Sequence, residues 1–278
     1  MRVLVTGGRG QLGRALQKSL AQHQVSLLDL PEMDITKDDV VQRYFNELTP
    51  DLVIHAAAWT DTAGCEADPE QALLVNGEGS RIVAEACARS GAAMVYISSN
   101  EVFDGEKREP YGEDDPPNPI NAYGRSKLAG ERHVESALER HYIVRTAWLY
   151  GAGRVSFPEK VLEAAARDGS LKGVTDEVAS PTWTADLAAG IAVLAQKAAP
   201  GTYHLTNSGH CSRFEWVQEI LRMRGLSDLP VEPATLEEFG APYHKPVFSV
   251  LSLDKARRTG IEMPSWQDAL ARYLRGAG

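Results

Sequence analysis

The first 150 residues alternate between short strand-like runs and longer helix-like stretches, and no other feature constrains the fold as tightly. Alternation of this kind favours parallel strands joined by right-handed crossovers, with helices on both faces of the sheet. The sequence therefore predicts an α/β fold with a doubly wound parallel sheet. The strand-like runs are residues 2–6, 24–30, 51–58, 92–99 and 142–150, and the helix-like stretches are residues 10–22, 36–49, 69–90 and 122–139.

A glycine-rich turn lies at the first strand–helix junction. The stretch VLVTGGRGQLGRAL places Gly7, Gly10 and Gly13 there, with two residues between successive glycines. Glycines at this junction permit a tight turn and let backbone N–H groups approach a pyrophosphate, which then lies at the positive end of the helix. A glycine triplet alone is weak evidence, but its position at the first junction predicts a Rossmann-type dinucleotide-binding domain.

The second half of the chain has a different character. After Tyr150, Gly and Pro interrupt the pattern, and short helices and isolated strands alternate irregularly. This favours a smaller C-terminal substrate-binding lobe beside the main sheet. We expect residues 1–150 to form the dinucleotide-binding domain and residues 151–278 to form mainly the substrate-binding lobe, partly interwoven with the first domain.

Composition narrows the choice of partners and compartment. The formal net charge is −9 with a pI of about 5.3, which argues against binding to nucleic acid or to an anionic membrane. Cys65, Cys87 and Cys211 are far apart and show no metal-ligand spacing, so neither a metal site nor a disulfide framework is expected. The N-terminus begins directly with a strand-like run, and no segment has membrane-spanning length. We therefore expect a soluble, cytoplasmic protein.

Two residues make opposite predictions about the nucleotide. Asp29 lies at the end of the second strand-like run, where an acid binds a ribose 2′-hydroxyl and favours NADH. Arg9, inside the glycine turn, favours NADPH because its guanidinium can meet a 2′-phosphate. The cofactor is therefore expected to be NADPH or NADH, with a modest preference for NADPH.

A serine, a tyrosine and a lysine are spaced for carbonyl chemistry. Ser99 ends the fourth strand-like run, at the sheet edge where open α/β sheets bind ligands. Tyr123 and Lys127 are four residues apart, on one face of a predicted helix. A nearby cation lowers the pKa of a tyrosine, so we expect Lys127 to activate Tyr123 as the proton donor. The serine hydroxyl would polarise the substrate carbonyl.

With these motifs, nearly the whole chain resembles the extended short-chain dehydrogenases/reductases, and within them the reductases of dTDP-4-keto sugars. The segments that carry the resemblance include GGRGQLG, PDLVIHAAAWT, VYISSNEVFDG, NAYGRSKLAGE and DEVASPTWTADLA. The resemblance implies reduction of the 4-keto group of a nucleotide-activated deoxysugar, dTDP-4-dehydro-L-rhamnose, and leaves a homodimer open. It also implies Ser99, Tyr123 and Lys127 as catalytic residues and Ser99, Asn100 and Trp148 as sugar contacts. The expected dinucleotide contacts are Gly10, Gln11, Leu12, Asp29, Asp34, Ile35, Ala58, Trp59 and Thr60, besides Gly7, Gly13, Tyr123 and Lys127.

The chain departs from that family after Ser99, where Asn100 and Glu101 replace an acid and an aromatic residue. The same run also resembles nucleotide-sugar dehydratases, in which an Asp–Glu pair acts as acid and base. Asn100 cannot donate the proton that elimination needs, which disfavours a dehydratase or a related epimerase. A non-catalytic dinucleotide-binding regulatory subunit is the third alternative, because fold alone does not determine function.

Overall fold

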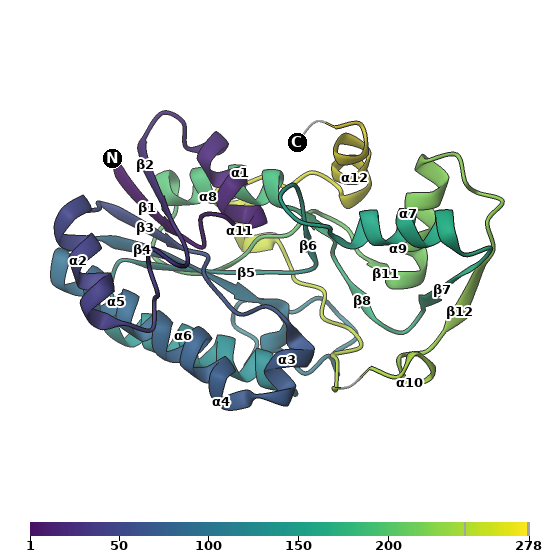
Figure 1. Ribbon diagram of the computed structural model, residues 1–278, viewed down its shortest axis with the longest axis horizontal. Helices are drawn as coiled ribbons and strands as arrows, with labels where there is room; N and C mark the ends of the chain where they lie inside the picture. Colours follow the sequence, from purple (N-terminus) through teal and green to yellow (C-terminus); the bar gives the residue numbers. More distant parts are fainter. Residues whose placement is uncertain (242, 277–278) are drawn as a thin grey trace.

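A six-stranded parallel sheet forms the centre of the computed structural model, which describes residues 1–241 and 243–276 (Figure 1). The strand order is β10-β5-β4-β3-β1-β2, and every neighbouring pair is parallel. This confirms the predicted Rossmann-type α/β fold. The strands are β1 (Arg2–Thr6), β2 (Gln24–Leu28), β3 (Leu52–His55), β4 (Ala93–Ser99), β5 (His141–Thr146) and β10 (Gly201–His204).

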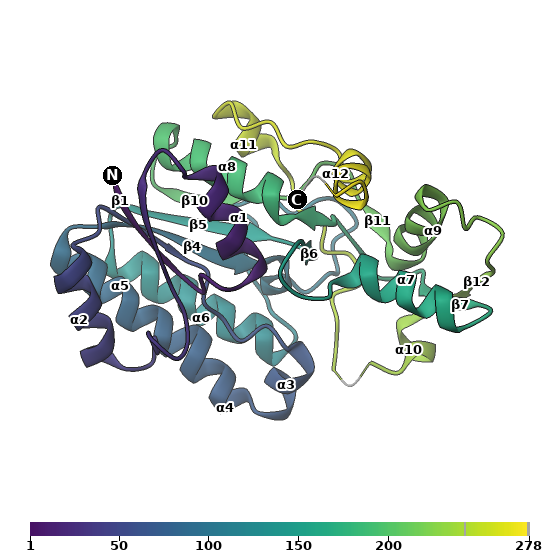
Figure 2. The same cartoon turned by 45° about the horizontal axis from the view of Figure 1, so that its top comes forward.

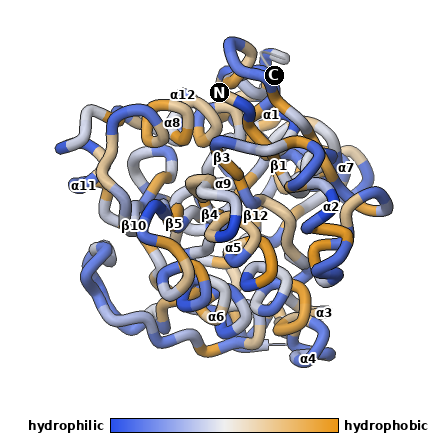
Figure 3. The backbone as a smooth tube through the Cα atoms, turned by 90° about the vertical axis from the view of Figure 1, so that its left-hand side faces the viewer, coloured by the Kyte–Doolittle hydropathy of each residue, from blue (hydrophilic) through white to orange (hydrophobic). Residues whose placement is uncertain are grey.

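Helices cover both faces of this sheet, so the main body has three layers (Figure 3). Each face is sealed by its own apolar cluster, since Leu16 and Leu187 pack under one layer and Phe45 and Val134 pack under the other. The first layer contains α1 (Gln11–Ser19), α8 (Thr184–Lys197) and α11 (Asp254–Arg258), and the second contains α2 (Asp38–Leu48), α5 (Gly79–Ser90) and α6 (Ala122–Ala137).

The stretch between β3 and β4 carries a run of short helical elements that lead into α5. It comprises α3 (Thr62–Ala67), α4 (Pro69–Ala72), the π-helical turn η1 (Leu73–Glu78) and then α5. A π turn inserts an extra residue and re-aims the side chains that follow, and such turns are frequent at functional sites. Here η1 packs against α6.

The remaining elements form a smaller lobe beside the carboxyl ends of the strands (Figures 1 and 2). Its core is aromatic, with Tyr150, Trp183, Trp216 and Trp266 all buried. The elements outside the main sheet are β6 (Leu149–Tyr150), α7 (Phe157–Arg167), β7 (Leu171–Val174), β8 (Val178–Ala179), β9 (Thr182–Trp183), β11 (Cys211–Ser212), α9 (Arg213–Met223), β12 (Val231–Ala234), α10 (Leu236–Phe239) and α12 (Trp266–Leu274), and a 3₁₀ turn η2 (Asn100–Val102) follows β4.

The second half of the chain contributes to the main body as well as to the lobe. Strand β10 pairs with β5 at the sheet edge, and α8 packs against α1. The division at residue 150 stays a prediction. No helix among the described residues is long and apolar enough to cross a membrane, and the described part of the chain holds no group of three or more His, Cys, Asp or Glu side chains arranged to bind a metal.

Candidate active site

The glycine turn between β1 and α1 is packed so closely that side chains are excluded from it. Gly7 has φ of +69°, and a Cβ there would lie 2.7 Å from the backbone nitrogen of Ala57. A Cβ on Gly13 would lie 2.6 Å from both Gly7 O and Gly8 Cα. Gly10 caps the N-terminus of α1 without a side chain. This leaves a bare backbone cradle at a helix N-terminus, which suits a pyrophosphate.

Gln11 and Leu12 follow the turn and are both buried. The Gln11 side chain donates to Gly151 O at 2.7 Å, and Arg154 Nε donates to Gln11 Oε1 at 3.3 Å. These bonds join the start of α1 to residues 151–154. The contact spans 140 residues of sequence, and no local sequence pattern predicted it.

Asp29 and Arg9 meet at the end of β2. The Asp29 carboxylate accepts hydrogen bonds from the backbone N–H groups of Arg9 at 3.0 Å and Leu30 at 2.9 Å. The Arg9 guanidinium donates to Leu30 O at 2.7 Å and pairs with Glu32 at the exposed rim. The two residues that bear on nucleotide choice therefore lie together just after β2.

Asp34 and Ile35 come next along the chain, and both side chains are already engaged. The Asp34 carboxylate accepts from the backbone N–H of Thr36 at 2.9 Å and from its hydroxyl at 2.7 Å. The hydroxyl bond lowers the pKa of Asp34. Ile35 is 6% exposed and packs against Gly79. The Ile35 side chain is taken up by this packing, whereas both bonds to the half-buried Asp34 are made to Oδ1 alone.

The loop after β3 contains Ala58, Trp59 and Thr60, and it is held by a residue that the sequence did not reveal. Asn76 accepts from the backbone N–H of Trp59 at 2.8 Å and donates to Trp59 O at 3.0 Å. The same amide donates to Ser126 Oγ on α6 at 2.9 Å. Asn76 is fully buried and lies in the π turn η1, so it links this loop to the helix that carries Tyr123.

Ser99 and Tyr123 are brought together by two capping interactions. Ser99 Oγ accepts from Glu101 N at 3.1 Å, which starts the turn η2. Asn121 Oδ1 accepts from Gly124 N at 2.8 Å, which starts α6. Tyr123 lies in the first turn of that helix, close enough to Ser99 for the serine hydroxyl to lower the pKa of the tyrosine. The predicted proximity of the serine and the tyrosine is thus present in the structure.

The electrostatics of the Tyr123–Lys127 pair differ from the sequence-based expectation. Burial raises the pKa of Tyr123, and the Glu101 carboxylate adds to the rise, so the expected lowering is wrong. Burial also lowers the pKa of Lys127 to about 7. The Lys127 ammonium lies 4.3 Å from the centre of the Tyr96 ring. Spacing along the helix was informative about which residues lie together, but burial is the largest cause of the shift in the pKa of Tyr123.

A buried polar network lies behind Lys127, one helical turn further along α6. Glu131 accepts two hydrogen bonds from Arg145, at 2.9 and 2.7 Å, and one from Ser98 at 2.5 Å. Glu131 also opposes the fall in the pKa of Lys127. Because β4, β5 and α6 are joined through these side chains, the lysine is held on a rigid support.

The two remaining predicted sugar contacts have different surroundings. Asn100 is buried and donates to Ser249 Oγ at 2.6 Å. Trp148 has φ of +45°, a conformation that costs energy for a bulky residue and that is often found at functional sites. Its ring stacks on Trp216 at 5.6 Å, and Arg213 Cζ lies 3.5 Å from its centre.

Arg213 belongs to a charged cluster that the sequence did not predict. Glu177 accepts from Arg213 and from Lys245, both at 3.3 Å. These bonds are longer than typical charge-assisted hydrogen bonds, and two cations share one carboxylate. Neither cation is fully buried, since the side chains of Arg213 and Lys245 are 20% and 23% exposed. The cluster therefore retains donors and positive charge that are accessible to an anion.

Taken together, the fold and this site define a Rossmann-type protein with a dinucleotide cradle and a Ser–Tyr–Lys constellation at one sheet edge. Residues 1–277 match the family model described as the RmlD substrate binding domain, and the chain belongs to that family.

Relatives and solved structures agree over almost the full length. The chain is 39% identical to dTDP-4-dehydrorhamnose reductase of Streptomyces griseus, over 97% of this chain and 91% of the relative. It is 38% identical to the spore coat polysaccharide biosynthesis protein SpsK of Bacillus subtilis, over 98% of this chain and 96% of the relative. The structure superposes on dTDP-4-dehydrorhamnose reductase of Bacillus anthracis in complex with NADP with a TM-score of 0.95 and 37% identity, covering 99% of this chain and 98% of that one.

Proposed function

We propose that this protein is an NADPH- or NADH-dependent reductase of the 4-keto group of a dTDP-activated 6-deoxysugar, with dTDP-4-dehydro-L-rhamnose as its substrate. One observation carries the proposal: Ser99 and Tyr123 meet at the carboxyl end of β4, with Lys127 one turn further along the same helix. The family relationship and the names of the relatives support the substrate class.

The residues of the cradle fit a nicotinamide dinucleotide. A Cβ would fill the space at Gly7 and Gly13, and the first turn of α1 presents free N–H groups to a pyrophosphate. We assign the adenosine ribose to the Asp29 and Arg9 end of β2 and the nicotinamide to the side of Tyr123. The bound cofactor supplies a hydride to a carbonyl carbon.

Ser99 and Tyr123 have complementary roles at the carbonyl oxygen. The Ser99 hydroxyl donates a hydrogen bond that polarises the carbonyl, and this bond strengthens as negative charge develops on the oxygen. Tyr123 then transfers its proton to that oxygen. Because its pKa is raised, Tyr123 is in the protonated form that reduction requires. An alkoxide is more basic than a phenolate, so proton transfer from Tyr123 remains favourable.

Lys127 has a positioning role in this scheme. Its ammonium can donate to the nicotinamide ribose and can stabilise the tyrosinate that proton transfer leaves. With a pKa of about 7, Lys127 is near the midpoint of its titration at neutral pH. Both roles need the protonated amine.

The substrate diphosphate is assigned to the cluster of Arg213, Lys245 and Glu177. The cluster has two positive charges and one negative charge, and each cation makes only a long bond to the carboxylate. A diphosphate can satisfy their remaining donors, including the fork of the guanidinium. Trp148, stacked against Arg213, then lies beside the sugar.

The alternatives are weaker on specific grounds. Elimination in a dehydratase needs an acid next to Glu101, but Asn100 occupies that position and its amide is bonded to Ser249. A non-catalytic regulatory subunit does not need a serine and a tyrosine brought together beside a buried lysine. A homodimer stays a prediction.

The proposal is tested by following nicotinamide oxidation with a panel of dTDP-4-keto-6-deoxy sugars and each of the two cofactors. We expect turnover with dTDP-4-dehydro-L-rhamnose and a higher kcat/KM with NADPH than with NADH. Formation of a 4-keto product from dTDP-glucose, without net consumption of cofactor, would instead support the dehydratase. Cofactor binding without turnover of any sugar would support a regulatory role.

A further inference from the structure

Glu101 is a half-buried carboxylate beside the start of α6, and none of the roles assigned above uses it. It lies in η2, two residues after Ser99. Its Oε2 accepts a hydrogen bond from Asn121 Nδ2 at 2.8 Å. Asn121 also caps α6, so one side chain fixes the direction of Glu101 and the start of the helix that bears Tyr123.

The second oxygen of this carboxylate is available to a ligand. Among the described residues, no side chain or backbone N–H donates to Glu101 Oε1, although the residue is half-buried. A carboxylate that leaves water has a strong demand for a donor at each oxygen. A group on the substrate can meet that demand at Oε1.

Glu101 is linked to both ends of the site through Asn121, which lies two residues before Tyr123 and whose Nδ2 also donates to His244 O, next to Lys245, at 3.0 Å. On one side it influences Tyr123, whose pKa its charge raises. On the other side the charges of Glu177, Lys245 and Arg213 act on Glu101. A substrate whose carbonyl is at Tyr123 and whose diphosphate is at Arg213 and Lys245 must place its sugar ring alongside Glu101.

We propose that Glu101 determines substrate specificity by accepting, through Oε1, a hydrogen bond from the sugar hydroxyl next to the reacting carbonyl. This inference rests on the proposed function. In a 4-keto-6-deoxy sugar, C5 carries the methyl group, so the hydroxyl that neighbours C4 is the one on C3. Glu101 therefore distinguishes sugars with a 3-hydroxyl from 3-deoxy sugars.

The ionisation of Glu101 supplies an independent readout. Burial raises its pKa, Asn121 lowers it, Glu177 raises it, and Lys245 and Arg213 lower it, with a net rise. Cys65, Tyr123 and Tyr243 are the other titratable groups that face it. The charged acceptor is present above this raised pKa and is lost as pH falls through it. Selectivity for the 3-hydroxyl should fall over the same range.

The test compares kcat/KM for dTDP-4-keto-6-deoxy sugars with and without the 3-hydroxyl in the wild-type protein, Glu101→Gln and Glu101→Leu. We expect the wild type to prefer the hydroxylated sugar by roughly 100-fold, because a site built to bind a hydroxyl rejects an analogue that lacks it. The preference should fall to within about threefold in Glu101→Leu. Glu101→Gln keeps a neutral acceptor, so it should retain part of the preference but lose the acid-side pH dependence.

Glu66→Gln is the matched control. Glu66 also contacts the start of α6, by accepting from Ala122 N at 2.7 Å, but it has no role at the sugar. The preference of Glu66→Gln for the sugar with a 3-hydroxyl should equal that of the wild type. An unchanged preference in both Glu101 variants, with an active wild type, would overturn the role of Glu101. A wild type that reduces neither sugar would overturn the proposed function and this inference with it. If Glu101→Leu fails to fold, the preference and pH profile of Glu101→Gln decide.

Discussion

At the scale of single residues, burial is the largest influence on the pKa values of Tyr123 and Lys127. Tyr123 and Lys127 were identifiable from their spacing and from the serine that ends β4. The direction of the shift in the pKa of Tyr123 was not identifiable, because it depends on how deeply α6 packs against β4 and η2. That packing is set by contacts between residues that are distant in sequence. Asn76 and the Glu177 cluster could not be predicted for the same reason, because their hydrogen-bond partners lie 17 to 68 residues away.

The lowered pKa of Lys127 predicts a pH dependence for cofactor binding. Its ammonium is present below about pH 7 and is lost as pH rises through that value. If the ammonium holds the nicotinamide ribose, affinity for NADPH should fall by roughly tenfold from about pH 6 to about pH 9, as expected for loss of one charge-assisted hydrogen bond. Fluorescence titration measures this. Lys127→Met should bind more weakly and show a flat profile over this range, and an equal slope in both proteins would contradict the assignment.

Arg9 predicts the preference between the two cofactors. Arg9→Ala should weaken NADPH binding by roughly 10- to 100-fold, the range for a charge-assisted bond to phosphate, and leave NADH unchanged. Glu32→Ala is the opposing variant, since it frees Arg9 from its exposed ion pair and should tighten NADPH binding. Dissociation constants for both cofactors check this. Equal losses for NADPH and NADH in Arg9→Ala would show that the guanidinium does not meet a 2′-phosphate.

At the scale of elements, the glycine turn is the part of the site that sequence predicted best. Its requirement is local, because the spacing of glycines and the strand–helix junction are both visible in the sequence. The close approach between Gly13 and the Gly7–Gly8 backbone gives that pattern its steric reason.

Gly13→Ala should therefore displace the turn and abolish dinucleotide binding. The added Cβ would lie 2.6 Å from backbone atoms, which cannot rotate away as a side chain could. We expect at least about a 100-fold loss in NADPH affinity, with a loss of stability of about 1–3 kcal/mol from overpacking. Gly169→Ala is the control, because a Cβ there meets nothing within 4 Å. Retention of NADPH affinity in Gly13→Ala would contradict the account of the cradle.

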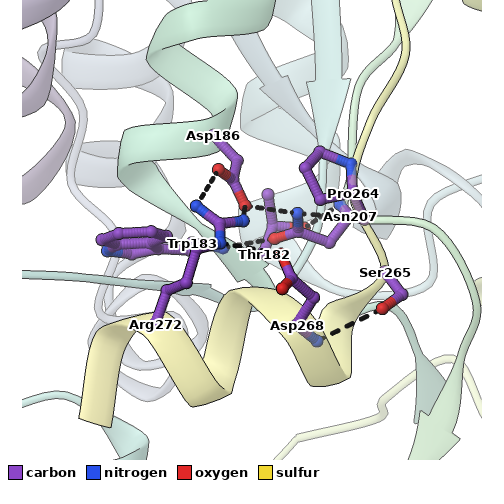
Figure 4. Close-up of polar contacts among 8 residues, drawn as sticks. All are labelled: Thr182, Trp183, Asp186, Asn207, Pro264, Ser265, Asp268 and Arg272. Carbon is purple, nitrogen blue, oxygen red and sulfur yellow. Dashed lines mark hydrogen bonds and ion pairs between the residues drawn. The ribbon is translucent and has the colours of Figure 1, made fainter. Parts of the chain in front are cut away.

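Helix α12 is joined to the main body by the charged network shown in Figure 4. Arg272 donates to both oxygens of Asp186, at 2.9 and 2.7 Å, and to Asp268 at 2.7 Å. Asn207 donates to Asp186 at 2.8 Å and accepts from Trp183 N at 2.8 Å. These residues come from α8, α12 and the segments beside them. Because they are far apart in the sequence, no local sequence pattern predicted the network.

Removing Asp186 should be costly because two buried or half-buried donors lose their acceptor. We expect Asp186→Ala to lower the free energy of unfolding by about 3 kcal/mol, the lower end of the range for breaking a buried ion pair. Asp268→Ala, which removes the exposed partner of the same arginine, should cost less than about 1 kcal/mol. Urea unfolding measures both. Equal effects would contradict the view that the buried partner anchors α12.

At the scale of the whole molecule, sequence predicted the parallel sheet and its two helical layers but not how the second half returns to it. The alternation in residues 1–150 is a local signal repeated many times. Strand β10 has four residues, and its place beside β5 depends on the path of the intervening lobe. The Glu177 cluster also depends on long-range contacts, because Glu177 precedes β10 in the chain whereas Arg213 and Lys245 follow it.

The most direct measurement of the central claim is transfer of an isotope from cofactor to sugar. The protein is supplied with dTDP-4-dehydro-L-rhamnose and with NADPH that carries deuterium at the transferable position of the nicotinamide, and the product is analysed by NMR. We predict one deuterium on C4 of the sugar for each NADPH oxidised, and in Tyr123→Phe the same cofactor affinity with a rate at least about 100-fold lower. A product without deuterium at C4, or full activity in Tyr123→Phe, would contradict the account.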